Sequence, residues 1–323
     1  MLKMNVSRLV AIAAVVTLLL PGAALAAEKY KGYERGDLLI SAAELKQMID
    51  AKDPKLVVLA VANVAEYRMP GHIPGAIRVW RPDYEIPVGE KYPFEGMMLE
   101  RAAFEAFARK NGISNDTKLV IYDHQYDATR LWWGFFLYGK RAQVLDGGFQ
   151  AWKAAGYDTD MLAPSAPPAG NFTAAAPNPK LTAVMADVVR AEKDPNVVLW
   201  DTREKAEWTG ADLKKGAYRK GRIPWAKFFN WKEFKKPVAE GEAFTEFKPA
   251  AEVQQVLQKF GVDKDKEHIF YCQSAVRTTT HIFAMYLLGW DIEKLRNYDG
   301  SWIEWSYHEK NPIVVDEAAT ATK

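Results

Sequence analysis

The residue of this sequence with the clearest chemical potential is Cys272, because it is the only cysteine among 323 residues. It follows an apolar run, residues 269–271, and begins a six-residue segment, CQSAVR, that ends at Arg277 and leads into a Thr-rich, apolar stretch ending near Leu288. This order predicts a buried strand, a tight loop and a helix. The N–H groups of such a loop, the positive end of the helix and the charge of Arg277 would favour a thiolate. The alternative is that Cys272 is an inert, buried apolar side chain.

A Cys and an Arg that frame a loop between a strand and a helix suit two reactions. One is attack on a phosphate ester, and the other is sulfur transfer through a persulfide on the thiol. Cys-dependent phosphatases place one residue more between Cys and Arg than the four that residues 273–276 supply here. We expect the shorter loop to be too small for a phosphate but able to hold the outer sulfur of a persulfide. The spacing therefore favours sulfur transfer.

The N-terminal residues predict export. Lys3 and Arg8 precede an apolar run at residues 9–20, and a small-residue segment follows at residues 23–27. This is the pattern of a signal peptide, residues 1–26, cleaved after residue 26 or 27. We therefore expect the mature protein in the periplasm, or otherwise exported, with no membrane span. An unpaired thiol is prone to oxidation in such a compartment. The presence of Cys272 despite this liability favours a functional role for it.

Composition argues against several classes of function. The chain has 43 basic and 41 acidic residues, and the two numbers become equal once Lys3 and Arg8 leave with the signal peptide. A neutral mature protein has no electrostatic attraction to nucleic acid. One cysteine cannot build a zinc or iron–sulfur site, and the five histidines lack metal-ligand spacing. We therefore expect no metal and no cofactor.

The sequence contains the same unit twice. The segments GHIPGA at Gly71 and GRIPWA at Gly221 begin 150 residues apart, and two xDGxxxxW segments, from Leu145 and Tyr298, begin 153 apart. Short apolar runs alternate with helical stretches around both. The fold class predicted is α/β, with two tandem domains that each contain a mainly parallel sheet flanked by helices.

The predicted domains are residues 28–157 and 181–315, joined by a Pro- and Ala-rich linker at 158–180 and followed by a disordered tail at 316–323. A capping box at Ser41 and Glu44 supports the first helix. Helices are expected at 40–51, 99–110, 130–138, 181–193 and 250–260, and strands at 55–61, 118–122, 196–201 and 268–271.

Superposing the two units places Asp123 at the position of Cys272. The first unit also has residues 60–62, Ala-Val-Ala, where the second has Asp201, Thr202 and Arg203. Only the second unit can carry out thiol chemistry, so we expect the first to be a structural partner that covers it.

These motifs resemble the tandem-domain rhodaneses, and among them the bacterial thiosulfate sulfurtransferases most. The resemblance extends over essentially the whole mature chain. The segments that carry it are GHIPGA with Trp80 and Arg81, LDGGFQAW from Leu145, Asp201-Thr202-Arg203, GRIPWA, residues 272–281 and YDGSWIEW from Tyr298. Each is weak by itself, but together and in order they are highly specific.

The resemblance implies that Cys272 attacks the outer sulfur of thiosulfate, releases sulfite, and passes the sulfur from its persulfide to cyanide or another thiophilic acceptor. The resemblance implies that Cys272 and Arg277 are catalytic residues and that Asp201 supports the site structurally. The residues assigned to the substrate are Gln273, Ser274, Ala275, Val276, Thr278 and Arg203. The implied partners are a small-molecule donor and acceptor, with a protein acceptor as a further option.

The sequence departs from the family pattern at several positions. CQSAVR lacks the adjacent cations of the animal thiosulfate enzymes, and unlike the mercaptopyruvate branch it ends in a cation. The exit from Arg277 to His281 resembles the Arg-Ser-Ser-His exit of bacterial thiosulfate enzymes, which favours thiosulfate. Glu207 aligns where those tandem enzymes have a substrate-binding Arg, and Trp225 replaces the usual Gly. A 3-mercaptopyruvate sulfurtransferase and a non-catalytic persulfide carrier remain alternatives.

Overall fold

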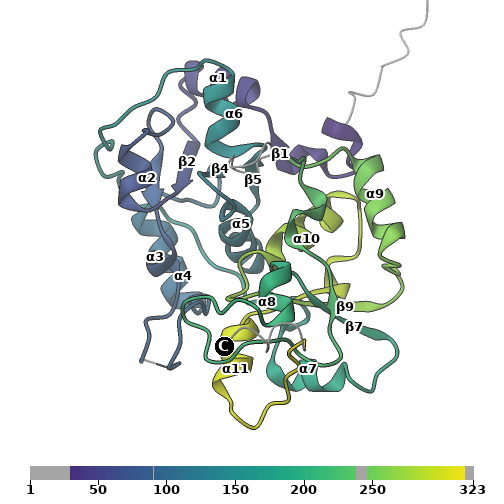
Figure 1. Ribbon diagram of the computed structural model, residues 1–323. Helices are drawn as coiled ribbons and strands as arrows, with labels where there is room; N and C mark the ends of the chain where they lie inside the picture. Colours follow the sequence, from purple (N-terminus) through teal and green to yellow (C-terminus); the bar gives the residue numbers. More distant parts are fainter. Residues whose placement is uncertain (1–29, 90, 238–245, 317–323) are drawn as a thin grey trace, which may run out of the picture.

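The computed structural model describes residues 30–89, 91–237 and 246–316, and these form two similar α/β domains side by side (Figure 1). The predicted signal peptide and all but the first residue of the predicted tail lie outside the described residues. No described helix is long and apolar enough to cross a membrane.

Each domain contains a five-stranded sheet in which all paired strands are parallel. The first sheet has the order β1-β5-β4-β2-β3 and the second has the order β6-β10-β9-β7-β8. The strands are β1 Leu39–Ile40, β2 Leu56–Val61, β3 Ile77–Val79, β4 Lys118–Asp123, β5 Ala142–Leu145, β6 Thr182–Ala183, β7 Val197–Asp201, β8 Lys227–Phe228, β9 Glu267–Tyr271 and β10 Leu295–Tyr298. The α/β class and the duplicated parallel sheets are confirmed.

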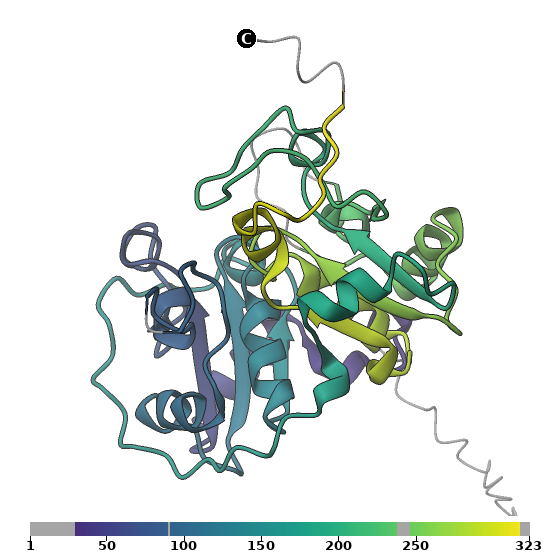
Figure 2. The ribbon, with the colours of Figure 1, turned by 90° about the horizontal axis from the view of Figure 1, so that it is seen from below.

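Helices cover both faces of each sheet (Figure 2). In the first domain they are α1 Ala42–Asp50, α2 Val64–Arg68, α3 Arg81–Tyr84, α4 Arg101–Lys110, α5 Ala128–Leu137 and α6 Gly148–Ala154. In the second they are α7 Met185–Arg190, α8 Lys205–Thr209, α9 Ala250–Lys259, α10 Thr278–Leu287 and α11 Ser301–Tyr307. One buried cluster beneath α1, α2 and α6 and another beneath α7 and α11 line the outer faces, and a larger cluster joins the inner faces.

The predicted elements are present with small shifts at their ends. The capping box at Ser41 and Glu44 begins α1 as expected, because Ser41 Oγ accepts from the Glu44 N–H and the Glu44 carboxylate accepts from the Ser41 N–H. The helix predicted at 181–193 is shorter, since residues 182–183 form β6 and α7 begins at Met185. The short helices α2, α3 and α8 were not predicted, because five residues or fewer show no amphipathic period.

Residues 158–178 contain no helix and no regular strand, and they run along the first domain (Figure 2). Backbone N–H groups of Gly170 and Phe172 donate to the carbonyls of Arg109 and Ile113, and the Phe172 side chain is buried. The segment that the composition marks as a linker is therefore tied to the first domain along much of its length.

The domains meet where α5 and α10 pack against each other, near the centre of Figure 1. Residues 150 apart face each other there: Thr129 Oγ1 lies 2.9 Å from Thr279 Oγ1, and the rings of Phe136 and Tyr286 are 5.1 Å apart. The packing of equivalent residues against one another gives the chain the geometry of a symmetric dimer within one polypeptide.

Two equivalent aspartates reinforce this interface. Asp299 of the second domain accepts from the Met98 N–H at 2.9 Å, and Asp146 of the first accepts from the Phe247 N–H at 2.8 Å. Asp299 also pairs with the fully buried Arg130 at 2.7 Å. Each domain therefore holds a backbone segment of the other next to its own DG motif.

Glu85 is a buried acid at this interface, with 9 % of its surface exposed and its Oε1 without a hydrogen-bond partner among the described residues. Burial raises the pKa of Glu85 to about 7, against the opposing effect of Arg130 and Arg81. Asp299 and Glu95 raise the pKa further.

We predict that Glu85→Gln changes the pH dependence of stability. Between pH 4.5 and about 7 the folded state keeps a proton on Glu85 that the unfolded chain has lost, so the free energy of unfolding falls as the pH rises through this window. The Glu85→Gln variant does not show this decrease, which amounts to ~3 kcal/mol in wild type. Denaturant titrations at several pH values measure it, with the exposed Glu192→Gln as control. Equal pH slopes for Glu85→Gln and wild type would contradict the assignment.

Candidate active site

Cys272 directly follows β9, a central strand of the second sheet, and the loop that it begins leads into α10 at Thr278. The predicted strand, loop and helix are all present. The carboxyl end of a central parallel strand is the usual place for a site in such a sheet. Cys272 is 1 % exposed, so its sulfur is screened from bulk solvent.

The loop is fastened to the start of α11, chiefly through Ser301. Ser301 Oγ accepts from the N–H groups of Cys272 at 3.2 Å and Ala275 at 3.0 Å, and it donates to the Tyr298 carbonyl at 2.8 Å. The N–H groups of Trp302 and Ile303 donate to the carbonyls of Cys272 and Gln273. The loop conformation is thus fixed by hydrogen bonds from a neighbouring element.

Both Ser301 and Ala275 have positive φ values, 49° and 55°. Residues other than glycine seldom adopt this region, and they do so mostly where surrounding contacts hold them there. At Ser301 the three hydrogen bonds of the hydroxyl supply that constraint.

Several N–H groups of the loop have no acceptor among the described residues. They belong to Gln273, Ser274, Val276, Arg277 and Thr278, whereas those of Cys272 and Ala275 are bonded to Ser301. Unpaired amides at a strand-to-helix loop are donors for an anion. Of the predicted amide donors, Ala275 is therefore already engaged within the protein.

Arg277, the cation of the loop, is bound by Glu207 of α8. Its Nη1 lies 2.6 Å from Glu207 Oε2 and its Nη2 lies 2.9 Å from Oε1, and the two side chains are 10 % and 2 % exposed. Burial acts to lower the pKa of Arg277, but the bond to Glu207 and the nearby Cys272 sulfur raise it above its ordinary value. The guanidinium is therefore charged and close to the sulfur.

Asp201 and Arg203 lie beneath the site, at the end of the neighbouring strand β7. The Arg203 guanidinium donates to both oxygens of Asp201 and to the Gly221 carbonyl, and it stacks over Trp302 at 4.4 Å. This network joins β7, the GRIPWA loop and α11. Arg203 is 1 % exposed, so its geometry is that of a supporting residue and its contact with substrate stays a prediction.

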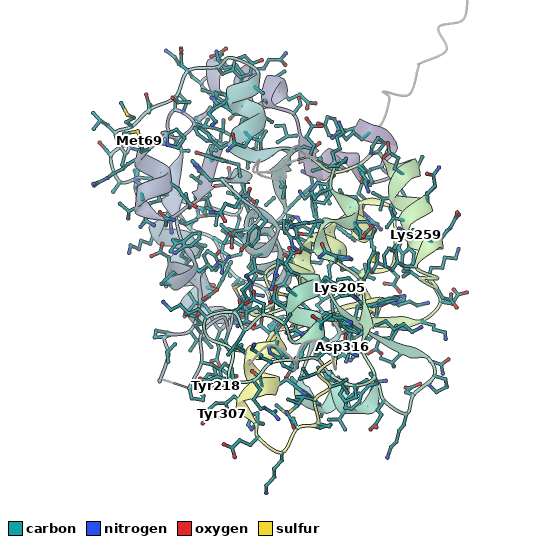
Figure 3. All side chains as sticks on the ribbon, in the orientation of Figure 1. Met69, Lys205, Tyr218, Lys259, Tyr307 and Asp316 are labelled. Atoms are coloured by element: carbon teal, nitrogen blue, oxygen red, sulfur yellow. The ribbon has the colours of Figure 1, made fainter. Side chains whose placement is uncertain are left out.

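A backbone segment of the first domain lies against the loop. A Cβ added at Gly96 would stand 2.7 Å from the Ser274 Cβ, and the carbonyl of Lys215 accepts from the Gln273 side chain. Tyr218 and Tyr307 pack together nearby, at the lower edge of the molecule in Figure 3, and the Tyr218 hydroxyl donates to the Pro93 carbonyl. Parts of both domains therefore surround the exposed side of the loop.

The basic cluster around residues 214–222 is mainly structural. Arg219 donates to five carbonyls at the end of α11, and Arg222 pairs with Asp316 at 2.7 Å. Lys214 is half exposed and is bound to Asp212 at 2.9 Å.

The first domain provides a direct comparison. The hydroxyls of Tyr122 and Tyr271 accept from the N–H of the third residue in each GxIPxA motif, which fixes the alignment and places Asp123 at the position of Cys272. Burial raises the pKa of Asp123 to about 6. Gly148 stands where the second domain has Ser301, and a Cβ there would lie 2.6 Å from the Asp123 carbonyl oxygen. The first copy thus lacks both the thiol and the hydroxyl that fastens its loop.

Sequence reasoning missed Ser301 and misjudged what Glu207 contacts. A signal for Ser301 existed, since the two DG motifs differ at the next residue, Gly148 in one and Ser301 in the other. The pairing of Glu207 with Arg277 joins residues 70 positions apart and has no local signature.

Comparison with known proteins agrees with this geometry. The model of the rhodanese-like domain matches residues 41–155 and 185–308. The sulfur carrier protein TtuD of Thermus thermophilus is 31 % identical over 88 % of this chain and 99 % of its own length. A Mycobacterium tuberculosis protein, named provisionally as a thiosulfate sulfurtransferase, is 29 % identical over 86 % of this chain and 98 % of its own.

A solved structure shows the same fold. The Escherichia coli 3-mercaptopyruvate sulfotransferase SseA superposes with a TM-score of 0.69 at 26 % identity, over 82 % of this chain and 98 % of that one. The chain therefore belongs to the rhodanese-like family, as a tandem-domain member of the sulfurtransferase class.

We predict that Ser301→Ala loosens the loop. Two buried N–H groups lose their acceptor, which lowers the free energy of unfolding by ~1–3 kcal/mol, and amide exchange at Cys272 and Ala275 becomes faster. Sulfur transfer falls by about tenfold because the reacting groups are less well positioned. Ser306→Ala, which removes a single accepted N–H bond on the same helix, is the control. Equal stability and activity of the two variants would contradict the role of Ser301.

Proposed function

We propose that this protein transfers a sulfane sulfur from thiosulfate to cyanide or another thiophilic acceptor through a persulfide on Cys272. The observation that carries the proposal is a lone, buried thiol at the start of a short loop in which five N–H groups have no acceptor among the described residues. Such a loop is suited to stabilise the negative charge of a terminal sulfur.

The reaction proceeds in two displacements. The Cys272 thiolate attacks the outer sulfur of thiosulfate, the sulfur–sulfur bond of the donor breaks, and sulfite leaves with the electron pair. The acceptor then attacks the outer sulfur of the persulfide, and the Cys272 thiolate is released. No net oxidant or reductant is consumed, and no cofactor is required.

Thiosulfate is the donor favoured by the residues that follow the loop, Arg277 to His281, and by the name of the mycobacterial relative. A second candidate is 3-mercaptopyruvate. The pairing of Arg277 with Glu207 favours this donor, because a neutralised guanidinium suits a monoanion better than a dianion. SseA, which shares the fold, is named a 3-mercaptopyruvate sulfotransferase.

A carrier without rapid turnover is a third candidate, supported by the name of the Thermus relative. It shares the Cys272 persulfide and differs in passing the sulfur only to a protein. Phosphate ester hydrolysis is disfavoured, because the loop is short and its cation is held by a carboxylate.

We also propose that the protein is exported, on the basis of the charged and apolar pattern of residues 1–26. The full chain expressed in a Gram-negative host should be recovered from the periplasmic fraction with its N-terminus at residue 27 or 28. Recovery of the uncleaved chain from the cytoplasm alone would refute this.

For the reaction itself, we predict that wild type releases sulfite from thiosulfate in the presence of cyanide with multiple turnovers, whereas Cys272→Ser is inactive because serine cannot form a persulfide. Assays with 3-mercaptopyruvate in parallel rank the donors. Mass spectrometry after exposure to thiosulfate should find one added sulfur on wild type only. A Cys272→Ser variant as active as wild type would end the proposal, and an adduct without turnover would favour the carrier.

A further inference from the structure

The pair formed by Arg277 and Glu207 has a consequence for the choice of donor, which rests on the proposed function. Arg277 presents both terminal nitrogens to Glu207 at 2.6 and 2.9 Å, and the carboxylate is 2 % exposed. In a bidentate pair of this kind, the two terminal nitrogens of the guanidinium donate to the carboxylate and are not available to bind a donor anion in the same way. It also neutralises the positive charge of Arg277, which interacts with the Cys272 sulfur.

Glu207 is held in place from its own helix as well. It occupies the third position of α8, and its Oε2 accepts from the backbone N–H of Glu204 at 3.2 Å. The carboxylate therefore lies between the helix start and the guanidinium, and it cannot swing aside without leaving the Glu204 N–H and the buried Arg277 unpaired.

A purely structural explanation for this glutamate is a helix cap. The first domain supplies the comparison, because Glu66 occupies the same position of α2, accepts from the Asn63 N–H at 3.1 Å, and pairs with the Gln125 side chain instead of an arginine. The residue equivalent to Arg277 there is Asp127. Capping thus explains a glutamate in both copies, but only Glu207 faces a cation of the Cys loop.

Other cations do not replace Arg277. Lys214 interacts electrostatically with both members of the pair, but it is half exposed and paired with Asp212. Its interaction with an anion in the loop is therefore screened by solvent. The attraction of a donor anion then depends on the loop amides and on how far Glu207 neutralises Arg277.

We propose that Glu207 is a positioning and specificity-determining residue, which holds and neutralises Arg277 and thereby lowers the affinity of the site for dianionic sulfur donors relative to donors of lower charge. The donors least affected carry one negative charge, such as 3-mercaptopyruvate, whose carbon–sulfur bond breaks as the enolate of pyruvate leaves, and alkyl persulfides, whose sulfur–sulfur bond breaks as a thiolate leaves. Thiosulfate, a dianion, is still turned over, but with a high KM because Glu207 neutralises Arg277. Glu207 acts through the guanidinium, not by contact with the transferred sulfur.

The test is a comparison of Glu207→Gln with Glu66→Gln, which removes the same charge at the equivalent position of the first domain. The Coulombic contribution to the binding free energy is proportional to the charge of the donor, which is −2 for thiosulfate and −1 for 3-mercaptopyruvate. Glu207→Gln should therefore lower the KM for thiosulfate by about tenfold and the KM for 3-mercaptopyruvate by about threefold. The kcat values should change less than the KM values, and Glu66→Gln should match wild type in both.

A second readout does not need turnover. Iodoacetate and iodoacetamide alkylate the same thiolate but differ by one negative charge, so the ratio of their rates at Cys272 reports the local charge independently of the thiolate fraction. Glu207→Gln should raise the ratio of iodoacetate to iodoacetamide by about threefold, the monoanion effect. A folded Glu207→Gln with unchanged KM values and an unchanged alkylation ratio overturns the inference and leaves the proposed function intact.

Glu207→Gln could fail to fold because it leaves Arg277 unpaired, and the double variant Arg277→Gln/Glu207→Gln then decides the question. Arg277→Gln leaves the carboxylate uncompensated and should lower the alkylation ratio, and adding Glu207→Gln should restore the ratio of wild type. If the double variant keeps the low ratio of Arg277→Gln, Glu207 has no influence on the site. Absence of turnover by wild type with any donor would instead refute the proposed function, and the alkylation ratios would still decide the role of Glu207.

Discussion

The arrangement of the site depends on the hydrogen bonds that join the Cys272 loop to the start of α11. β10 lies next to β9, so the turn that follows β10 meets the turn that follows β9 at the same edge of the sheet. Ser301 places its hydroxyl between these turns, and its left-handed backbone is stabilised by the bonds that it makes. The free amides of the loop are available only because this tie holds Cys272 and Ala275 in their observed orientation.

The duplicated domain separates what the fold requires from what the chemistry requires. Both copies keep the sheet order, the GxIPxA motif with its tyrosine, and the DG aspartate that binds a backbone N–H of the opposite domain. The first copy has four residues between Asp123 and α5, one fewer than lie between Cys272 and α10, and it has Gly148 in place of Ser301. The shared features therefore maintain the architecture, and the differences are confined to the loop and its support.

The sequence predicted the parts of the structure that are local or repeated. The buried strands, the longer helices and the offset between the copies follow from apolar runs and matching motifs, and the position of Cys272 between strand and helix follows from the same pattern. The contact of Glu207 with Arg277 could not be predicted, because α8 has only five residues and the contact depends on how β7 and β9 lie side by side. The resemblance to the family marked Glu207 as a departure from its pattern but indicated no partner for it.

The first domain also contributes to the site directly, which explains why a copy without a thiol is useful to the second. Gly96 has a φ of 101° and approaches Ser274 so closely that an added Cβ would collide with it. The same residue's carbonyl accepts from Arg130, whose guanidinium pairs with Asp299 of the second DG motif. The first domain is thereby braced against both the Cys272 loop and the turn that supports it. A single domain would leave this side of the loop open to water, and the charges of a persulfide and of its donor would be screened by solvent.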